Sequence, residues 1–327
     1  RMSLPFISVV VPIYNRNNWV QEVIGCLERQ TYPKDRYEVI VVDNGSKDGA
    51  WEWVQQKVAS SSLFAISCYR NDAPEKVPAA SRNLGIKKAK GEIVAFTDSD
   101  CQPAPDWLLE GSAVFTEGVG IVEGKTIPVP DDPAPPLCRI KIIDGTRSYF
   151  DTANIFYLKS VLLEVGGFAR DFYLNGYPRF YGEDLDLGYR VKGKGYRVAF
   201  AEKAVVMHHN HPQTVWQWLK EPKLVFICPY IAAKHPSARR ELLFANYFLS
   251  ASTAAFDLGA VATVLAVLVH PLFLLGWLPF VLAKLREQGA GASLPGRLVR
   301  LAGGTVRSFV TFGVLLAASV RYRSVVI

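Results

Sequence analysis

Short apolar runs and amphipathic segments alternate along the first half of the chain. The apolar runs have the length of strands, and they lie at residues 7–11, 38–42, 64–69 and 93–96. In the segments between them apolar residues recur every three or four positions, at residues 20–27, 50–58 and 78–89. Runs of the first kind predict buried strands, and segments of the second kind predict helices. We therefore expect an α/β fold with a mostly parallel central sheet and helices on both faces.

The same alternation continues, less regularly, through the middle of the chain. It predicts a helix at residues 106–115 and strands at residues 119–124, 152–157 and 196–201. Residues 128–136 are rich in proline and acidic residues, which indicates a loop or lid. A helix that follows the strand at residues 152–157 is expected to end at a pair of glycines.

Polar residues directly follow three of the predicted strands, at residues 12–16, 43–46 and 98–100. Open α/β sheets bind their ligands at this carboxyl edge. Asp98 and Asp100 are two positions apart, so in an extended chain they share a face and can converge on one cation. A solvated acidic loop is the alternative for so short a pattern. No glycine-rich dinucleotide or P-loop motif is present, so a phosphate-bearing ligand would need a metal ion and basic side chains here.

Charge and cysteine content indicate the kind of partner and the cellular setting, but they do not identify one class of protein. The formal net charge is +7, which suits an anionic partner such as nucleic acid, acidic lipid or a phosphorylated substrate. The five cysteines are odd in number and contain no C-x-x-C pair, so neither a disulfide framework nor a structural zinc site is expected. A reduced, cytoplasmic setting fits this usage. Residues 1–6 lead straight into a strand pattern, and no signal peptide is expected there.

Four motifs occur in order at the predicted strand ends. They are V-V-V-P-I-Y-N at residues 9–15, V-V-D-N-G-S-K-D at 41–48, A-S-R-N-L-G at 80–85 and T-D-S-D at 97–100. In this combination the chain resembles the family 2 glycosyltransferases of the GT-A fold, from about Ile7 to His208. The resemblance implies an inverting enzyme that takes a sugar from a nucleotide-sugar donor, usually a UDP-sugar. It also implies a divalent metal cofactor, Mn²⁺ or Mg²⁺.

The resemblance gives roles to the residues at these strand ends. It implies a nucleotide-sugar site formed by Pro12, Tyr14, Asn15, Arg16, Asp43, Arg82, Asp98 and Ser99. Asp43 would bind the base, Arg82 would lie near the phosphates, and Asp98 would touch the ribose or the metal shell. Asp100 would be the main metal ligand, because a hard cation held by carboxylates offsets the charge of the leaving diphosphate. The alternatives are plain packing for Tyr14, helix capping for Asp43 and a surface ion pair for Arg82.

A second acidic cluster lies at residues 180–190, where Glu183 and Asp184 begin a predicted helix. Acidic residues are favoured at the positive end of a helix, so simple stabilisation of the helix start is one explanation. By the resemblance, Asp184 is the general base that takes the proton of an acceptor hydroxyl as its oxygen attacks the anomeric carbon. Glu183 would orient the acceptor. Asp186 is expected to lie behind the site or to face solvent.

Three histidines, His208, His209 and His211, follow the last predicted strand. They have no second ligand cluster at zinc-finger spacing. The family resembled often has a histidine metal ligand in this region, and His208 matches that position best. His209 and His211 are expected to be loop residues, and the alternative is that one of them is the metal ligand in place of His208. The absence of a Q-x-x-R-W motif argues against processive polymer synthesis.

The last third of the chain is markedly apolar. Residues 242–283 are interrupted only by Asp257 and His270, which allows one long spanning helix or a tight pair of helices. A shorter apolar segment at residues 301–320 contains Arg307, which argues against one continuous span. An interfacial or re-entrant helix is the alternative for this segment. Basic residues flank both segments, as is typical beside phosphate headgroups: Arg239, Arg240, Lys284, Arg286, Arg297, Arg300, Arg321 and Arg323. A buried helical hairpin in a soluble protein is the alternative.

Together these features predict a catalytic GT-A domain at residues 1–222 and a membrane-associated helical region at residues 223–327. We expect an inverting glycosyltransferase at the inner or plasma membrane, with its catalytic domain on the cytoplasmic side. Its acceptor would be a hydroxyl of a lipid or lipid-linked saccharide. A polyprenyl-phosphate acceptor and a non-catalytic nucleotide-sugar-binding membrane protein are the alternatives. Nucleic acid is not an expected partner, because the basic residues concentrate beside apolar runs.

Overall fold

The computed structural model describes residues 4–73, 77–135, 137–146, 149–169, 172, 182–286 and 294–327, with the backbone only for residues 294–300. The chain forms two compact units, Arg1–Pro212 and Gln213–Ile327. The first contains the sheet and the second is helical.

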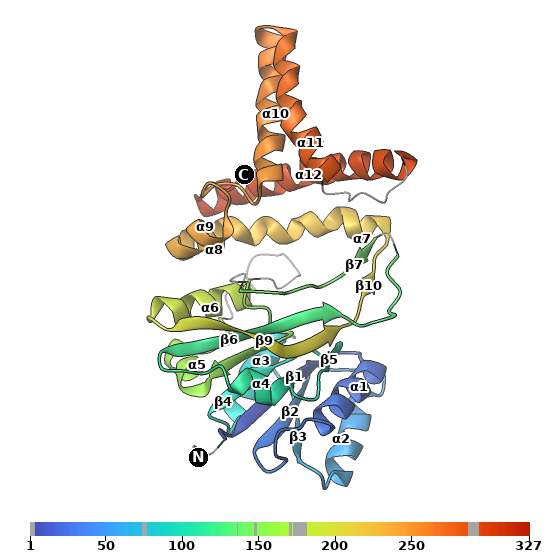
Figure 1. Ribbon diagram of the computed structural model, residues 1–327, viewed down its shortest axis with the longest axis vertical. Coiled ribbons are helices and arrows are strands. Elements are labelled where there is room, and N and C mark those ends of the chain that lie inside the picture. Colours follow the sequence, from blue (N-terminus) through green and yellow to red (C-terminus); the bar gives the residue numbers. More distant parts are fainter. Residues whose placement is uncertain are drawn as a thin grey trace. The chain divides into compact units, whose positions relative to one another are not determined.

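The first unit is built on an eight-stranded sheet (Figure 1). The strands lie in the order β3-β2-β1-β4-β8-β6-β9-β5. Their bounds are β1 Ile7–Ile13, β2 Tyr37–Asp43, β3 Ala65–Arg70, β4 Ile93–Phe96, β5 Cys101–Pro103, β6 Val119–Pro128, β8 Ile155–Leu158 and β9 Arg197–His208. A separate pair is formed by β7 (Cys138–Arg139) and β10 (His211–Pro212). Strands β3, β2, β1 and β4 are parallel, whereas β8 runs antiparallel to both of its neighbours.

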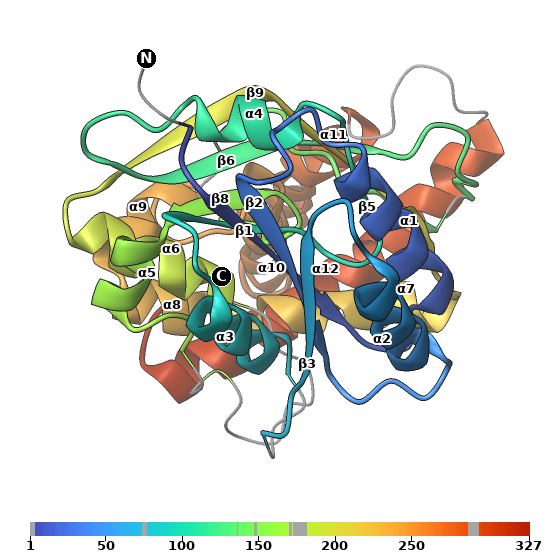
Figure 2. The same cartoon turned by 90° about the horizontal axis from the view of Figure 1, so that it is seen from below.

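Helices cover both faces of the parallel strands, as the alternation of the sequence predicts. Their bounds are α1 Asn17–Glu28, α2 Ala50–Ser60, α3 Pro78–Lys88, α4 Trp107–Ser112, α5 Lys159–Val165 and α6 Glu183–Gly193. Val9 and Val11 share a core with the apolar side of α1 and α2. Val10 points to the opposite face, where its methyl groups lie so close to Gly85 of α3 that any larger residue there would clash. Figure 2 shows α3 on one side of β1–β3 and α1 and α2 on the other.

The strand ends that carry the polar motifs lie together. Because β2, β1 and β4 are adjacent and parallel, their carboxyl ends, which lead into residues 12–16, 43–46 and 98–100, open at one edge of the sheet. This confirms the expectation for the fold and for these three segments.

One strand is longer than the sequence pattern predicts. The strand expected at residues 196–201 continues as β9 to His208. After an irregularity at Gly124, the end of β6 keeps pairing with β9, and the short strand β5 pairs with β9 on the other side. This extension brings the histidines at the end of β9 to the segment that follows Asp98.

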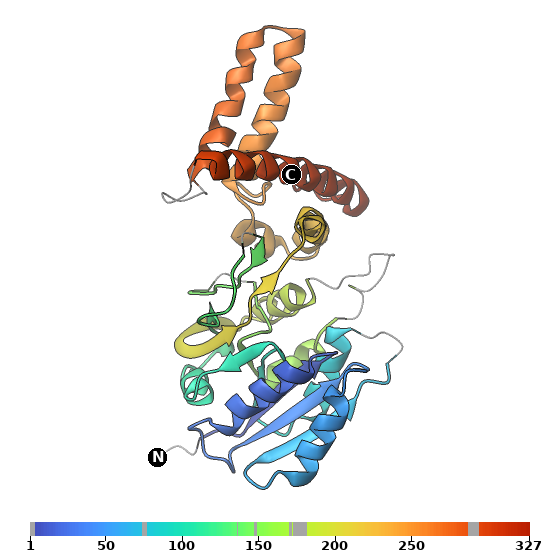
Figure 3. The same ribbon diagram turned by 90° about the vertical axis from the view of Figure 1, so that its right-hand side faces the viewer.

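The second unit is mainly helical in the residues that the structure describes, with one isolated β-bridge between Phe244 and Phe248. Its elements are α7 Val215–Lys220, η2 Glu221–Ile227, α8 Cys228–Lys234, α9 Pro236–Leu242, α10 Ala251–Leu268, η3 Pro271–Trp277, α11 Leu278–Arg286 and α12 Leu294–Tyr322. Helix α10 and the η3–α11 segment form a hairpin that turns at Pro271, and α12 runs across its base (Figure 3). Phe256 joins these helices through ring contacts with Trp277, Phe280 and Phe309. The residues at 242–283 therefore form the tight pair of helices rather than one long helix.

Helix α12 corrects a prediction. Arg307 was expected to argue against one continuous span here, yet the helix is continuous over Leu294–Tyr322. The guanidinium pairs with Glu221 at 2.9 Å and lies over the ring of Trp218, so the charge is satisfied without breaking the helix. Two helical segments, Ala251–Leu268 and Leu301–Tyr322, are long and apolar enough to cross a membrane by length and composition.

Candidate active site

Arg82 connects two of the predicted site segments. It projects from α3, is buried, and its Nη2 atom lies 2.9 Å from Oδ1 of Asp98. Its Nη1 atom lies 3.5 Å from Oε1 of Glu183 at the start of α6. One guanidinium therefore holds the end of β4 and the second acidic cluster together, and a surface ion pair is not its role.

The neighbouring Asn83 fixes the turn that precedes this cluster. Its side-chain amide donates to the carbonyl of Phe168 at 2.7 Å, and its oxygen accepts from the Phe168 N–H at 2.8 Å. Gly167 has φ +68° and presses against the same amide, which leaves no room for a side chain. The Phe168 ring in turn lies 5.7 Å from the guanidinium of Arg82. Arg82 therefore forms the ion pairs of the site, and its neighbour Asn83 holds Phe168 against the Arg82 guanidinium.

Asp100 is the centre of a cluster of basic groups. Its carboxylate lies 3.0 Å from Nε2 of His211, 3.7 Å from Nε2 of His208 and 4.0 Å from Nη2 of Arg16. Burial disfavours its charged form, but the His211 hydrogen bond and the nearby basic groups His208 and Arg16 hold the pKa of Asp100 well below its usual range. Asp100 is therefore an ionised carboxylate in this cluster.

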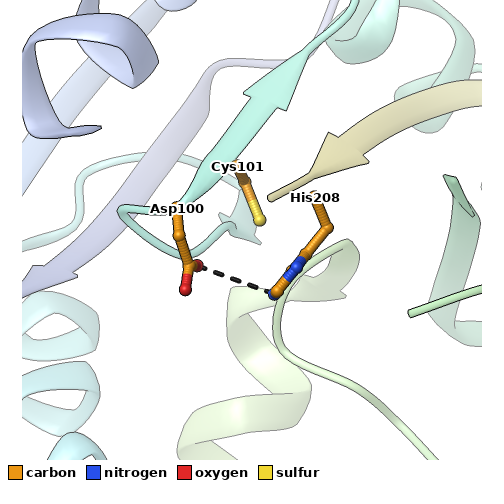
Figure 4. Close-up of side chains that lie close together, drawn as sticks. All are labelled: Asp100, Cys101 and His208. Carbon is orange, nitrogen blue, oxygen red and sulfur yellow. Dashed lines mark ion pairs between the residues drawn. The ribbon is translucent and has the colours of Figure 1, made fainter. Parts of the chain in front are cut away.

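His208 is oriented as a metal ligand. Its Nδ1 atom lies 2.7 Å from the backbone carbonyl of His209, a position for donating a hydrogen bond, which leaves the Nε2 lone pair available. Burial, with the charge of Lys141, lowers the pKa of His208, so the ring is neutral near pH 7. Ligand atoms of Asp100, Cys101 and His208 all lie within 4.8 Å of one another (Figure 4). A carboxylate oxygen, an imidazole nitrogen and a sulfur form a donor set that fits a divalent cation.

Asp98 and Asp100 have different surroundings, although they are only two residues apart. Asp98 is paired with Arg82, whereas Asp100 faces the histidines. The predicted preference of Asp100 over Asp98 as metal ligand agrees with this placement and stays a prediction.

Trp19 of α1 packs against three parts of the Asp100 cluster. Its ring stacks on His209 with centroids 5.2 Å apart and contacts His211 edge-on at 5.4 Å. The guanidinium of Arg16 lies 4.3 Å from the same ring. The His209 ring also contacts two carboxylates: its Nε2 atom lies 2.8 Å from Glu22 and its Nδ1 atom lies 2.9 Å from Asp132. Trp19 was not singled out from the sequence. His211 was expected to be a loop residue, but it begins β10 and reaches Asp100. The contacts of both residues join segments far apart in the chain.

The Trp19→Ala variant is expected to bind Mn²⁺ about 10- to 100-fold more weakly, because residues that orient metal ligands typically contribute that much. The variant loses the surface on which His211 and Arg16 rest. Calorimetric titration with Mn²⁺ measures the effect. Trp19→Phe is the matched control and should retain most of the affinity. Equal Mn²⁺ affinity in the alanine variant would contradict the orienting role.

Glu183 and Asp184 form the acidic half of the site, at the start of α6 after Gly182. Burial raises the pKa of both carboxyls, and the mutual repulsion with Glu183 and the charge of Asp151 raise that of Asp184 further. Asp151 is ion-paired with Lys141 at 2.9 Å. Oε2 of Glu183 is buried and has no hydrogen-bond partner among the residues that the structure describes. Phe180 and Tyr181 of the predicted motif lie outside the described residues.

An Asp151→Asn variant should shift the pH dependence of any reaction in which Asp184 acts as a base. Asp184 accepts a proton only when ionised, so activity rises with pH through its pKa. Removing the Asp151 charge lowers that pKa, and the acid limb of the kcat/KM profile should move down by about one pH unit. The exposed Asp35→Asn substitution should leave the limb in place. An unchanged or upward-shifted limb in Asp151→Asn would refute the coupling.

The residues predicted to bind the nucleotide make their hydrogen bonds mainly within the loops that follow β1 and β2. Asn15, with φ +51°, accepts a hydrogen bond from Lys47 N–H at 2.9 Å, and its own N–H donates to Ser46 Oγ at 3.0 Å. Asp43 is fully buried and accepts from the N–H groups of its own turn and from Arg70 at 3.1 Å. Tyr14 is 55% exposed, so packing in a core is not its role.

Pro12 and Ser99 are the remaining residues predicted to bind the nucleotide sugar. Pro12 is half-buried in β1, and Ser99 is buried between the two acidic residues of the D-x-D motif. Contact of Pro12, Tyr14, Asn15, Asp43 and Ser99 with a nucleotide stays a prediction.

Family models match most of the chain. A model described as Glycosyl transferase family 2 matches residues 8–165, and one described as Glycosyl transferase family group 2 matches residues 143–285. The chain is similar to glycosyltransferase AglE of Haloferax volcanii, with 32% identity over 219 residues that cover 64% of this chain and 69% of that protein. It is also similar to validoxylamine A glucosyltransferase of Streptomyces hygroscopicus subsp. limoneus, with 26% identity over 282 residues. That match covers 74% of this chain and 59% of the relative, so less than two thirds of the relative is spanned.

Solved structures share the fold. The mannosyltransferase PcManGT from Pyrobaculum calidifontis, in complex with GDP-Man and Mn²⁺, is 20% identical with a TM-score of 0.59 over 98% of this chain and 88% of that one. Staphylococcus aureus TarS in complex with UDP-GlcNAc is 16% identical with a TM-score of 0.51 over 98% and 92%. At these identities the likeness concerns the fold, and it confirms the GT-A-type α/β architecture.

Proposed function

Because the chain belongs to glycosyl transferase family 2, it is a glycosyltransferase that uses a nucleotide-sugar donor, and we propose that it inverts the anomeric centre of the transferred sugar. The observation that carries this proposal is the buried guanidinium of Arg82, which links Asp98 on the donor side to Glu183 beside Asp184. The donor and the acceptor of a single displacement must meet at such a junction. We infer a UDP-sugar donor from the family motifs at residues 9–15 and 41–48.

Asp100 and His208 would hold the divalent ion, Mn²⁺ or Mg²⁺, and Asp98 would face the ribose. When bound, the ion offsets the negative charge that develops on the leaving diphosphate. Arg82 adds a fixed positive charge beside Asp98, and Arg16 adds a second one beside Asp100. The Arg82 guanidinium is hydrogen-bonded to Asp98, so its charge is held in place before the donor arrives.

Asp184 is proposed as the general base, with Glu183 as the group that orients the acceptor. The unpartnered Oε2 atom of Glu183 supports this division, because a buried carboxylate oxygen without a hydrogen bond is available to an acceptor hydroxyl. The acceptor oxygen would lose its proton to Asp184 while it attacks from the face opposite the nucleotide. One displacement at the anomeric carbon inverts its configuration.

Residues 1–222 are proposed as the catalytic domain and residues 223–327 as a region that attaches to the cytoplasmic face of the membrane. The exposed apolar surface of the helical hairpin supports attachment. At its turn, Val267, Leu268 and Leu272 are 81%, 75% and 67% exposed. Exposed leucines and valines in such a cluster are costly in water and favourable in lipid. A membrane-bound enzyme of this kind is proposed to glycosylate a lipid or lipid-linked saccharide.

Two charges at the hairpin turn are expected to abolish membrane binding. The double variant Leu268→Asp/Leu272→Asp places two carboxylates where insertion costs about 3 kcal/mol each. Flotation of the full chain with liposomes of phosphatidylglycerol and phosphatidylethanolamine measures the effect. The matched control is Leu63→Asp/Leu163→Asp, which changes two exposed leucines of the first unit, 65% and 60% accessible. Equal flotation of the hairpin variant would contradict insertion of the hairpin.

The proposed reaction is tested with a panel of UDP-, GDP- and dTDP-sugars. Each donor is incubated with the enzyme, Mn²⁺ and a lipid extract, and both donor hydrolysis and sugar transfer are followed. Transfer from a UDP-sugar, with inversion of the anomeric signal in the NMR spectrum of the product, is expected. Retention of configuration would refute the single displacement, and transfer from a GDP-sugar alone would refute the choice of nucleotide.

A further inference from the structure

Cys101 places a sulfur atom inside the Asp100 cluster. It is the first residue of β5, and in the antiparallel pairing with β9 it lies directly opposite His208. Directly opposed residues of two strands point to the same side of a sheet. Figure 4 shows the sulfur beside the imidazole, with the carboxylate of Asp100 completing the group.

The spacing of these atoms is suited to a shared ion. The ligand atoms of Asp100, Cys101 and His208 lie within 4.8 Å of one another. Metal–ligand distances are about 2.0–2.3 Å for oxygen, nitrogen and sulfur, so ligand atoms on one ion lie at most about 4.5 Å apart. Only a small adjustment of side chains would bring all three onto one cation. The Nε2 atom of His208 points towards the Asp100 carboxylate and is fixed through the Nδ1 contact, which is a second indication that a ligand binds at this point.

Packing is the competing role for Cys101. Its side chain is 1% exposed and belongs to the apolar core around Trp107 and Val206. A small apolar residue would serve that role equally well. A buried sulfur beside a carboxylate and an imidazole supplies a third donor atom, which alanine or valine would not supply.

We propose that Cys101 is a ligand of the divalent ion at the Asp100 site and makes this site selective for transition-metal ions over Mg²⁺. Thiolate sulfur binds Co²⁺, Zn²⁺ and Cd²⁺ strongly, whereas Mg²⁺ takes oxygen ligands almost exclusively. On binding, the thiol gives its proton to solvent and the sulfur forms a bond to the ion. The proposal rests on the metal dependence proposed above, and it names the residue that would set the choice of metal.

Co²⁺ alone is the probe for this ligand. Added to the full chain, Co²⁺ is expected to produce the near-ultraviolet sulfur-to-cobalt charge-transfer band that only a bound sulfur gives. Cys101→Ser should lose the band and bind Co²⁺ at least about tenfold more weakly, since even outer-shell changes weaken metal binding that much. Its Mg²⁺ affinity should change little. Cys68→Ser is the matched control, because Cys68 lies half-buried on β3 outside this cluster, and it should keep both band and affinity.

The outcomes separate this inference from the proposed function. Tight Co²⁺ binding to the wild-type chain without the charge-transfer band would overturn the role of Cys101 and leave the metal site intact. No Co²⁺ binding at all would overturn the metal dependence itself. A band that persists in Cys101→Ser would assign the sulfur to another cysteine and would also refute the proposal.

Discussion

Replacing Asp184 by asparagine is expected to lower kcat for sugar transfer by about 10²- to 10⁴-fold, the range that a positioned general base contributes. Asparagine keeps the size of the side chain but cannot take the acceptor proton. Donor affinity should change little, because Asp184 lies on α6, whereas the predicted nucleotide residues lie at the ends of β1, β2 and β4 and, for Arg82, on α3. Initial rates and donor binding, measured with the same preparation, separate the two effects.

Stability provides an independent readout for the same variant. Burial raises the pKa of Asp184, so its ionised form is disfavoured in the folded state. Such a group makes folding less favourable as pH rises from its ordinary pKa towards the raised one. Asparagine removes that cost, and Asp184→Asn should unfold at a higher temperature at pH 7, by about 0.5–2 kcal/mol of added stability. An inactive but more stable variant cannot be explained by misfolding.

The control for Asp184→Asn is Glu52→Gln, which changes an exposed acid in the first turn of α2. It tests whether loss of a charge at a helix start has any effect on catalysis, and none is expected. A near-normal rate for Asp184→Asn would indicate that the acceptor arrives already ionised. That result would favour the polyprenyl-phosphate acceptor over the hydroxyl acceptor.

The fold could be predicted from the sequence because its signals are local. Each parallel strand is a short apolar run that ends in polar residues, and the covering helices α1 and α2 repeat their apolar positions at helical spacing. The continuity of α12 could not be predicted in this way. Whether Arg307 interrupts a helix depends on whether a partner neutralises it, and Glu221 is 86 residues away in the chain.

The site could be predicted only in part, because some of its residues meet through contacts between segments far apart in the chain. The D-x-D and E-D motifs are local patterns, and Arg82 lies in a motif of its own. The clustering of Asp100 with His211 depends on the register of β5 against β9, which joins Cys101 to His208 across more than a hundred residues. No periodicity in the sequence encodes that register. The pairing of Lys141 with Asp151 is hidden likewise, because both residues lie in irregular segments on either side of residues 147–148.

Asp100→Asn is expected to abolish Mn²⁺ binding and, with it, metal-dependent transfer. Asp100 supplies the only carboxylate in the cluster formed by Asp100, Cys101 and His208. Without it a divalent cation would lose its charged oxygen ligand and would lie close to the positive Arg16, with at most the Cys101 sulfur to offset its charge. A loss of at least about 100-fold in Mn²⁺ affinity is expected, the upper end of what outer-shell changes cause. Calorimetry with Mn²⁺ in the absence of donor measures it.

Asp98→Asn makes this test discriminating, because it removes the other carboxylate of the same motif. Asp98 is bound to Arg82 rather than to the histidines, so its loss should weaken donor binding while Mn²⁺ alone still binds. Arg82 would retain only its longer contact with Glu183, and the donor side would lose its fixed charge arrangement. If both variants lost Mn²⁺ binding equally, the two carboxylates would share one ion. If only Asp98→Asn lost it, the assignment of Asp100 as the main ligand would be reversed.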